Sequence, residues 1–167
     1  PADPWTLFTQ WFEQAGSANP GQWFEVNAMT LATVGPDGQP AARMVLLKGF
    51  DASGFVFFTN LDSQKGRHIA VNPRVALVFY WAALERQVRV EGRAIEVSRP
   101  EVETYARRRP RGSQLSALAS QQSQPIADRQ ELEQRLARIE AQWHGLEVPV
   151  PERWGGYRVE PTAIEFW

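Results

Sequence analysis

The fold is decided by residues 27–60, NAMTLATVGPDGQPAARMVLLKGFDASGFVFFTN. The stretch holds three runs with the length and apolar, β-branched composition of strands, at 27–34, 41–48 and 55–60. Turn sequences separate these runs, GPDG at 35–38 and DASG at 51–54. Strands that are adjacent in sequence and joined by tight turns pair antiparallel. The stretch therefore predicts a β-meander.

Four further strands are expected outside this stretch, at residues 74–81, 84–97, 156–159 and 163–167. The second of them is long and alternates in polarity, as half-buried strands do. About seven antiparallel strands, with helices as insertions, favour a small barrel that closes its own edges. We expect an α+β fold, mainly antiparallel β, forming a single domain over residues 1–167 with both termini incomplete.

Capping residues mark the helices of the first half of the chain. A helix is expected to begin at Asp3-Pro4 and end near Gly16, because a carboxylate cap and a proline at the first position precede apolar residues at helical spacing. A second, short helix is expected to be capped by Asp62 or Ser63. It must stop before Asn72-Pro73, since the residue before a proline is disfavoured in a helix.

Three more helical segments are expected in the second half. The capping box Ser98-Arg99-Pro100-Glu101 opens a helix that Pro110 ends. One or two helical turns are expected over residues 115–119. Asp128 caps a further helix with an apolar stripe at positions i, i+4, i+7 and i+11, formed by Leu132, Leu136, Ile139 and Trp143.

Composition excludes several classes of protein. The 167 residues contain no cysteine, which excludes a disulfide scaffold, a thiolate metal site and a cysteine nucleophile. A net charge of −1 gives no bulk electrostatic case for nucleic-acid binding. The longest apolar runs are far too short to span a bilayer, and no signal segment opens the chain. We therefore expect a cytoplasmic protein that binds neither nucleic acid nor a membrane.

Metal sites and familiar catalytic motifs are not indicated. The two histidines, His68 and His144, have no ligand-spaced partners, and we interpret them as surface or helix-packing residues. The sequence has no nucleophile elbow, P-loop or dinucleotide fingerprint. We expect no metal, and the residue types alone assign no catalytic residue.

Two segments near the N-terminal strands could bind an anion. Arg43 and Lys48 bracket an apolar stretch of one strand, but side chains five residues apart point to opposite faces, so the two cannot easily hold one phosphate. Residues 59–65, TNLDSQK, run from a strand end into a helix start, where backbone donors, hydroxyls and Lys65 could cradle a phosphate. The alternative for this segment is a capped helix with a solvated lysine.

A third candidate lies in the arginine-rich segment. Tyr105 and Arg109 are i, i+4 neighbours on the expected helix, and Ser113 could return to the same place after the chain turns at Gly112. A guanidinium fork with two hydroxyls is good phosphate chemistry. Spacing alone leaves Arg108 possible as well, and an ordinary basic surface patch remains the alternative. Amides at residues 121–124 and 85–87 could read the edge of a heterocycle, or simply face water.

Six short motifs follow one another in order along the chain. They are Arg43-Met44-Val45-Leu46-Leu47-Lys48, Phe57-Phe58-Thr59-Asn60, Glu85-Arg86-Gln87-Val88, Arg109-Pro110-Arg111, Ser120-Gln121-Gln122-Ser123 and Trp154-Gly155-Gly156-Tyr157. This series resembles the pyridoxine (pyridoxamine) 5′-phosphate oxidase family over nearly the whole chain. The resemblance implies the FMN-binding split β-barrel with peripheral helices.

The resemblance also implies roles for individual residues. Those that would bind or line FMN are Arg43, Met44, Val45, Leu46, Leu47, Lys48, Phe58, Thr59, Gln64, Lys65, Gln87, Gln122, Ser123 and Trp167. Among them, Arg43, Lys65, Gln122 and Ser123 would hold the FMN phosphate, and Gln87 would bond the isoalloxazine edge. Those that match the ligands of the substrate's 5′-phosphate are Lys48, Tyr105, Arg109 and Ser113.

The implied reaction is the FMN-dependent oxidation of pyridoxine 5′-phosphate or pyridoxamine 5′-phosphate to pyridoxal 5′-phosphate. Oxygen would be the electron acceptor, and hydrogen peroxide would be released. The resemblance further implies a homodimer with FMN at the subunit interface.

The sequence departs from the family pattern at two places that bear on function. No Arg-x-His-x-Arg segment follows Glu165-Phe166-Trp167, and Gln64 stands where many members carry arginine beside the FMN phosphate. Two alternatives stay open. One is a related split-barrel oxidase of another, phenazine-type aromatic substrate, against which the complete set of substrate-phosphate residues argues. The other is a non-catalytic protein that binds flavin or pyridoxal phosphate, supported only by the missing segment.

Overall fold

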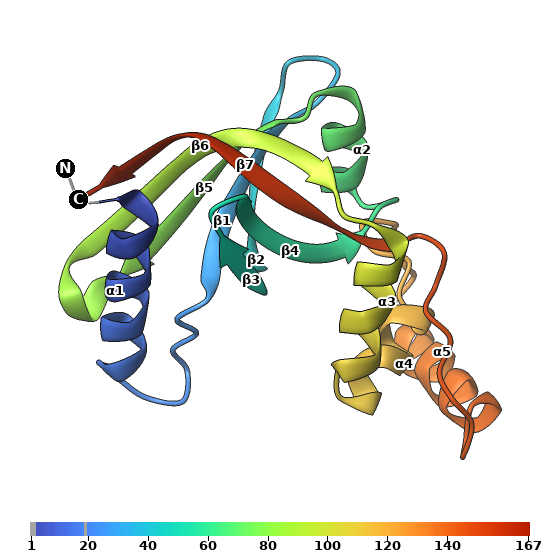
Figure 1. Ribbon diagram of the computed structural model, residues 1–167. Coiled ribbons are helices and arrows are strands. Elements are labelled where there is room, and N and C mark those ends of the chain that lie inside the picture. Colours follow the sequence, from blue (N-terminus) through green and yellow to red (C-terminus); the bar gives the residue numbers. More distant parts are fainter. Residues whose placement is uncertain (1–2, 19) are drawn as a thin grey trace. The chain divides into compact units, whose positions relative to one another are not determined.

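The computed structural model describes residues 3–18 and 20–167, which hold five α-helices and seven strands (Figure 1). The strands are β1 (Ala28–Val34), β2 (Pro40–Leu46), β3 (Gly49–Asp51), β4 (Gly54–Asn60), β5 (Arg74–Trp81), β6 (Arg86–Glu96) and β7 (Trp154–Phe166). The helices are α1 (Pro4–Ser17), α2 (Gln64–Val71), α3 (Arg99–Arg108), α4 (Arg111–Ala119) and α5 (Arg129–Gln142), and a 3₁₀ turn spans Ala82–Leu84.

The strands form one sheet in the order β2-β1-β5-β6-β7-β4-β3. The registers of β1 with β2, β1 with β5, β3 with β4 and β5 with β6 are all antiparallel, as expected from the short connections. The predicted meander is wrong at one place, because the strands expected at 41–48 and 55–60, which correspond to β2 and β4, are not neighbours in this order; β4 instead pairs with the short strand β3, which was not predicted.

The reason is a change of neighbours immediately after β2. The amide of Leu47 donates to the carbonyl of Asn27 beside β1, whereas the next amide, that of Lys48, donates to the carbonyl of Val56 in β4, each at 2.8 Å. Two successive amides thus bond to strands from the two ends of the sheet. This corner curls the sheet toward closure, which protects strand edges as the predicted barrel requires.

The chain divides into two compact units. The first comprises residues 1–57, 68–95 and 157–167, and the second comprises residues 58–67 and 96–156. The boundaries fall inside β4, α2, β6 and β7, so secondary structure runs through each of them. A single domain over the whole chain stays a prediction.

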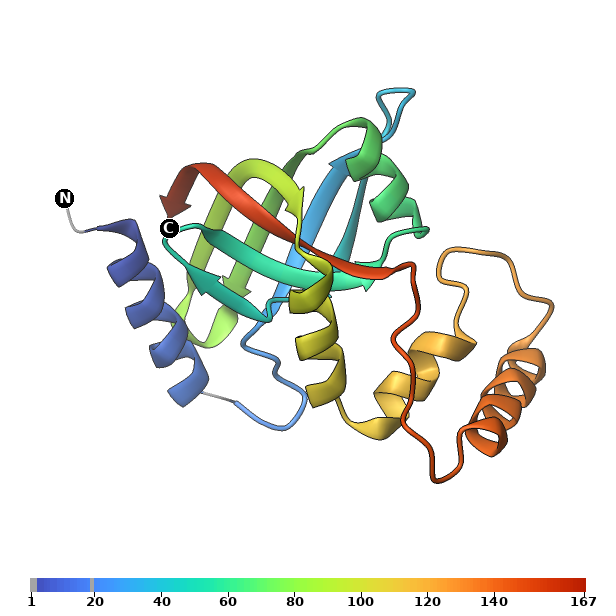
Figure 2. The ribbon, with the colours of Figure 1, turned by 45° about the vertical axis from the view of Figure 1, so that its right-hand side comes forward.

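Aromatic rings form the core of the first unit. Phe8, on α1, is fully buried and meets the rings of Phe50, Phe55 and Phe79 edge-on at centroid distances of 4.8–5.2 Å. Figures 1 and 2 both show α1 (dark blue) lying beside the sheet. The helix starts as the sequence predicts, with the Asp3 carboxylate accepting from the amide of Thr6 at 2.9 Å.

Two boundaries in the second half of the chain differ from prediction. The two expected closing strands are one continuous strand, β7, which passes through Pro161. Proline fixes φ at a value that extended backbone tolerates and removes only one donor, so it interrupts a strand less than a helix. Helix α4 begins at Arg111, directly after Pro110, and is longer than the turn or two expected. Helix α5 has the predicted Asp128 cap, but none of its residues is buried.

Gly54 provides a test of the β3–β4 turn. It has φ +141°, and a Cβ there would lie 2.3 Å from the carbonyl oxygen of Val159 in β7. Because backbone atoms cannot give way cheaply, Gly54→Ala should lower the free energy of unfolding by about 2 kcal/mol or more in urea denaturation. Gly49→Ala is the matched control, since a Cβ at Gly49 meets nothing within 4 Å. Equal denaturation midpoints for the two variants would contradict this reading of the turn.

Candidate functional site

A buried ammonium group lies at the start of α2, in the second unit. Lys65 is only 6 % exposed, and its Nζ donates to Thr59 Oγ1 at 3.2 Å, Ser63 Oγ at 3.2 Å and Gln122 Oε1 at 3.1 Å. Thr59 in turn donates its hydroxyl to Gln122 Oε1 at 3.2 Å. The solvated lysine considered from the sequence is therefore wrong, and the structure brings Thr59, Lys65 and Gln122 together.

The chemistry of this Lys65 cluster suits an anion. Taking an ammonium out of water costs several kcal/mol unless opposite charge or strong acceptors replace the water. The three oxygens that accept from Nζ belong to hydroxyl and amide groups, which carry no formal charge. The N-terminal end of α2 adds further positive potential. An oxyanion would therefore bind here more favourably than it would at a solvated lysine.

The loop that carries Gln122 has unusual backbone geometry. Ser123 has φ +66°, in the left-handed region that residues with a Cβ seldom adopt, and the amide of Gln124 closes the turn on the carbonyl of Gln121 at 3.1 Å. Such a conformation costs of order 1 kcal/mol and tends to occur at functional sites. The predicted ligand Ser123 has a strained backbone next to a residue that contacts Lys65.

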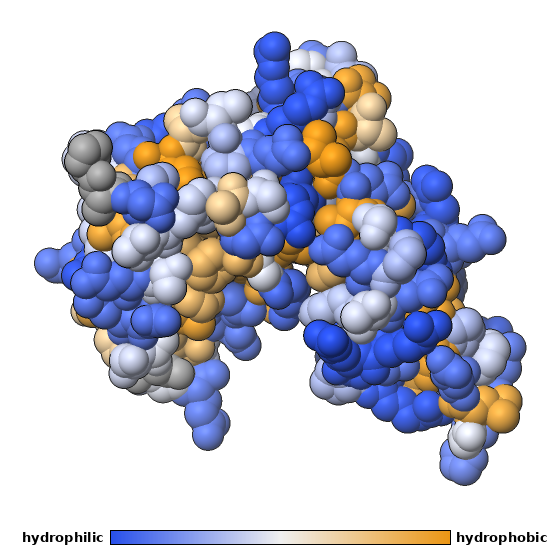
Figure 3. All heavy atoms as spheres, in the orientation of Figure 1, coloured by the Kyte–Doolittle hydropathy of each residue, from blue (hydrophilic) through white to orange (hydrophobic). Residues whose placement is uncertain are grey.

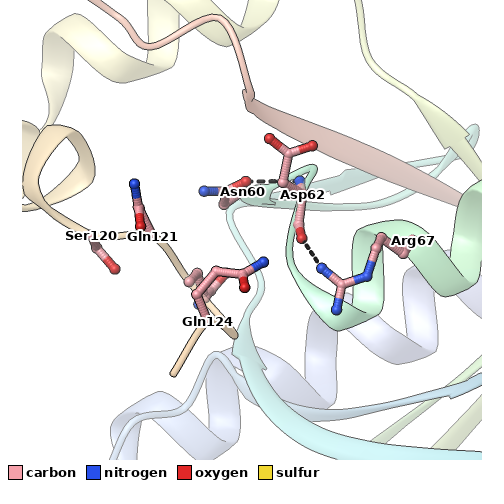
Figure 4. A pocket seen from close by; sticks show the side chains of 7 residues that line it. Asn60, Asp62, Arg67, Ser120, Gln121 and Gln124 are labelled. Atoms are coloured by element: carbon pink, nitrogen blue, oxygen red, sulfur yellow. Dashed lines mark hydrogen bonds between the residues drawn. The ribbon is translucent and has the colours of Figure 1, made fainter. Parts of the chain in front are cut away.

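A polar pocket opens beside the same loop (Figure 4). Its volume is about 470 Å³, and Figure 4 shows the Gln124 side chain on one wall and Asn60, Asp62 and Arg67 on the facing one. The guanidinium of Arg67 donates to the carbonyl of Asp62 there. The lining offers amide, hydroxyl and charged groups to a polar ligand. It is formed by Asn60, Asp62, Arg67, Ser120, Gln121, Gln122 and Gln124.

Three nearly parallel aromatic rings form a second cluster in this unit. Phe58 stacks on Tyr105 with centroids 4.1 Å apart and an interplanar angle of 5°, and on Trp154 at 5.6 Å and 9°. The guanidinium carbon of Arg109 lies 4.7 Å from the centroid of the Trp154 indole ring. The predicted phosphate ligands Tyr105 and Arg109 thus belong to one packed group, and we call these four residues the aromatic cluster.

Among the described residues, the polar ends of this cluster and the hydroxyl of the predicted ligand Ser113 have no acceptor. Within the described residues, the Arg109 guanidinium, the Tyr105 hydroxyl and the Ser113 hydroxyl make no side-chain hydrogen bond and no ion pair. Burial lowers the pKa of Arg109, while the negative charge of ionised Tyr105 would raise it. All three groups are half-buried, whereas Arg107 and Arg108 are exposed. Of the three arginines, Arg109 is the one that combines partial burial with donors that have no acceptor among the described residues, and its role as a phosphate ligand stays a prediction.

In the first unit, Arg43 is held against the interior of the sheet. Its Nη1 donates to Thr33 Oγ1 at 2.7 Å and to the carbonyls of Ala41 and Leu31 at 3.0 and 3.2 Å. Thr33 is 1 % exposed, and its hydroxyl lies 3.1 Å from His68 Nδ1. Burial lowers the pKa of the Arg43 guanidinium. His68 is thus a half-buried packing residue, in line with its interpretation from the sequence.

The other predicted residues of β2 are arranged by strand alternation. Arg43 and Val45 are half-buried, whereas Met44 and Leu46 are 61 % and 39 % exposed. Lys48 follows the end of β2 and is exposed, and its side chain has no partner among the described residues. The observed exposure agrees with the argument that Arg43 and Lys48 face different ways.

Gln87 and Trp167 are paired through their backbones. The amide of Gln87 donates to the carbonyl of Trp167 at 2.9 Å, and the reverse bond measures 2.8 Å. Helix α1 supports this end of β7, because Trp11 meets Phe166 edge-on at 5.3 Å. The guanidinium of Arg86 in turn lies over the Trp11 ring at 4.6 Å. Two residues predicted to contact one cofactor are therefore neighbours in the first unit.

Comparison with known proteins now identifies the family. The sequence model of the family described as "Pyridoxamine 5′-phosphate oxidase" matches residues 22–143 of this chain. The chain belongs to the pyridoxamine 5′-phosphate oxidase family. This confirms the family resemblance of the six motifs and the prediction that the chain is an oxidoreductase of that family.

Curated relatives extend the match to nearly the whole chain. The pyridoxine/pyridoxamine 5′-phosphate oxidase of Rubrobacter xylanophilus is 58 % identical over 165 residues, covering 99 % of this chain and 75 % of the relative. The enzyme of the same name from Acaryochloris marina is 56 % identical over 166 residues, covering 99 % and 74 %.

Solved structures confirm the fold. PhzG from Burkholderia lata 383, in complex with tetrahydrophenazine-1-carboxylic acid, superposes with a TM-score of 0.91 and 30 % identity, covering 100 % of this chain and 80 % of that one. A pyridoxamine 5′-phosphate oxidase-related, FMN binding protein from Nostoc punctiforme gives a TM-score of 0.75 at 17 % identity, covering 99 % and 85 %. The predicted split β-barrel with peripheral helices is confirmed.

Ser63 belongs to the possible phosphate cradle that the sequence indicates at residues 59–65, and the structure shows that Ser63 is fully buried and accepts from Lys65. Two other supporting residues were missed. Trp154 was part of a motif without a role, and Thr33 carried no polar signal within an apolar strand. Over the described part of the chain, no three potential metal-ligating side chains cluster. No helix in that part has the length and hydropathy to cross a membrane.

The Arg43–Thr33 contact can be tested through stability. Thr33→Val removes the hydroxyl but keeps the shape, leaving a donor of Arg43 with one acceptor fewer in a buried place. We expect urea denaturation to show a loss of about 1–3 kcal/mol. Thr30→Val, on the same strand, is the control, because the Thr30 hydroxyl contacts only the sulfur of Met44, at 3.4 Å. If both variants lose the same free energy of unfolding, the hydrogen bond between Arg43 and Thr33 does not stabilise the fold more than an ordinary threonine contact does.

Proposed function

We propose that this chain oxidises pyridoxine 5′-phosphate, or pyridoxamine 5′-phosphate, to pyridoxal 5′-phosphate with FMN as cofactor. The alcohol substrate loses two electrons and two protons at C4′, and oxygen takes up both pairs as hydrogen peroxide. The amine substrate also consumes one water and releases ammonia. The observation that carries the proposal is a set of hydrogen-bond donors, those of Arg109, Tyr105 and Ser113, that have no acceptor among the described residues, in a chain 58 % identical to an oxidase of that name.

The Lys65 cluster fits the phosphate of FMN. Lys65 supplies a buried positive charge, and Thr59, Ser63 and Gln122 supply hydroxyl and amide groups at hydrogen-bond distance from it. When bound, FMN would accept the hydride from the substrate and pass the electrons to oxygen. The remaining assigned contacts stay proposals for this cofactor: Arg43, Met44, Val45, Leu46, Leu47, Lys48, Phe58, Gln64, Gln87, Ser123 and Trp167.

The aromatic cluster fits the phosphate of the substrate. The Arg109 guanidinium offers two parallel donors, and the hydroxyls of Tyr105 and Ser113 offer two more. We propose Lys48 as a further ligand of the same group. These residues bind and orient the substrate, so the chain's contribution to the rate is mainly placement of C4′.

A homodimer with FMN at the subunit interface is part of the proposal. It is supported by the exposed apolar side chains of Met44 and Leu46 on the edge strand β2, and by Trp167, which is 68 % exposed. A cytoplasmic location stays a prediction.

A second candidate function is the oxidation of a larger aromatic acid. It is favoured by the structural match to PhzG, which was solved with tetrahydrophenazine-1-carboxylic acid. The identity to that protein is 30 %, against 58 % to the pyridoxine/pyridoxamine 5′-phosphate oxidase of Rubrobacter xylanophilus. The vitamin B6 phosphates are therefore the better-supported substrates.

The first experiment separates these functions from mere binding. The protein is loaded with FMN under anaerobic conditions, and flavin absorbance is followed after adding pyridoxine 5′-phosphate. We expect bleaching that air reverses with the release of one hydrogen peroxide per aldehyde formed. Bleaching by a dihydrophenazine carboxylic acid alone would support the second candidate. A flavin that binds but is bleached by neither substrate would contradict both oxidase functions.

The Lys65 cluster predicts a ranking of FMN affinities. Lys65→Ala removes a buried charge that hydrogen-bonds three residues, whereas Gln64 is exposed. Charged hydrogen bonds contribute roughly 1.5–3 kcal/mol, so the Kd for FMN should rise about 10- to 100-fold for Lys65→Ala. For Gln64→Ala the rise should stay below about threefold. Quenching of FMN fluorescence measures both constants, and equal values would reject the assignment.

A further inference from the structure

The Arg109 guanidinium packs over the indole ring of Trp154. We propose that Trp154 is a positioning residue that fixes the Arg109 guanidinium for the phosphate group of the substrate. The proposal deepens the proposed function and rests on it, since Arg109 is there a ligand of that phosphate. An indole has a single N–H donor and no acceptor, so it can hold the cation only through the face of its ring. It would act through the guanidinium alone.

The contact leaves the useful part of Arg109 available. The guanidinium carbon lies 4.7 Å from the centroid of the indole ring, and a cation in this position is attracted by the electron-rich face of the ring. The N–H donors of Arg109 lie in the guanidinium plane, and among the described residues they have no acceptor. The contact therefore restricts the rotation of a long side chain. It leaves the N–H groups of the guanidinium available to bind an oxyanion through two hydrogen bonds.

The neighbouring arginines show what the contact changes. Arg107 is exposed and forms ion pairs with Glu103 at 3.7 Å and Glu147 at 3.4 Å. Arg108 is exposed as well, and Figure 3 shows a strongly hydrophilic surface over α3 and α4. Solvated arginines of this kind contribute little to the binding of one ligand. Only Arg109 combines partial burial, a ring beneath it and donors without acceptors.

Trp154 is itself held from two directions. The guanidinium of Arg99 binds the backbone of the segment that leads into it, donating to the carbonyls of Val150 at 2.8 Å, Pro151 at 3.0 Å and Trp154 at 3.2 Å. The rings of Phe58 and Tyr105 then fix the indole plane. The side chain is only 9 % exposed.

Helix α3 provides contacts to both the backbone and the ring of Trp154. Arg99 at its first residue holds the Trp154 backbone, Tyr105 packs near the ring, and Arg109 follows its last residue and lies over the same ring. The Trp154 ring and the Arg109 guanidinium over it are therefore already in place before any substrate binds. A preorganised donor loses less conformational entropy when it binds its ligand.

The test compares Trp154→Leu and Trp154→Phe with wild-type protein saturated with FMN. Cation–π contacts correspond to roughly 2- to 30-fold in a binding constant. We expect the KM for pyridoxine 5′-phosphate to rise about tenfold for Trp154→Leu and about threefold for Trp154→Phe, with kcat changed less than about twofold. Inhibition by inorganic phosphate should weaken in parallel. The kcat/KM for pyridoxine, which lacks the phosphate, should stay at the wild-type value.

Two controls separate positioning from a general loss of structure. The first control is Trp143→Leu, which replaces another tryptophan of the same unit. The hydrogen bond from Arg111 goes to the backbone carbonyl of Trp143, so the substitution keeps it. It should leave all constants near wild type. In an Arg109→Ala background, Trp154→Leu should raise KM no further, because the group that it positions is already gone.

The outcomes divide clearly. If wild-type protein does not oxidise pyridoxine 5′-phosphate, the proposed function fails. If it does, and Trp154→Leu keeps the wild-type KM or loses pyridoxine oxidation equally, the role of Trp154 fails alone. Should Trp154→Leu not fold, Trp154→Phe decides, since unchanged KM and unchanged phosphate inhibition would overturn the proposal.

Discussion

Strand alternation at the end of β4 organises the second unit. Phe58 and Thr59 are consecutive, so their side chains point to opposite faces, and each supports a different cluster. The Thr59 hydroxyl joins Lys65 and Gln122, while the Phe58 ring stacks on the rings of Tyr105 and Trp154. A slip of one residue would exchange the ring and the hydroxyl and dissolve both clusters. The register is held just beyond the strand, where the amide of Leu61 donates to the carbonyl of Arg153 at 2.7 Å.

Within each unit, a cation is placed among neutral oxygens. Lys65 donates to two hydroxyls and an amide, and Arg43 donates to a hydroxyl and two carbonyls. These acceptors compensate the loss of water without cancelling the positive charge, as a carboxylate at the same distance would. Arranged in this way, a buried cation costs some stability but keeps its attraction for an incoming oxyanion.

Local features of this fold could be predicted and the long-range ones could not. Asp3, Ser98 and Asp128 cap helices as expected, because a cap depends on residues three positions apart. The separation of β2 from β3 depends on the amides of Leu47 and Lys48 choosing different strands, which no local pattern encodes. The same limit applies to the site. Local patterns made Lys65 and Arg109 candidates, but they could not show that Gln122, 57 residues away, accepts from Lys65 or that Trp154 lies beneath Arg109.

Positive charge alone does not decide which anion this chain prefers, since phosphate esters and carboxylates would both be attracted. Donor geometry does discriminate. A carboxylate presents its lone pairs in one plane, whereas a phosphate monoester presents three terminal oxygens around a tetrahedral centre. The Arg109 guanidinium lies over the indole of Trp154, and the hydroxyls of Tyr105 and Ser113 belong to α3 and α4. A phosphate can accept hydrogen bonds from donors in several directions. A carboxylate that is already bound to the guanidinium has few lone pairs left for further donors. This difference supports the proposal that these residues take a phosphate ester in preference to a planar acid.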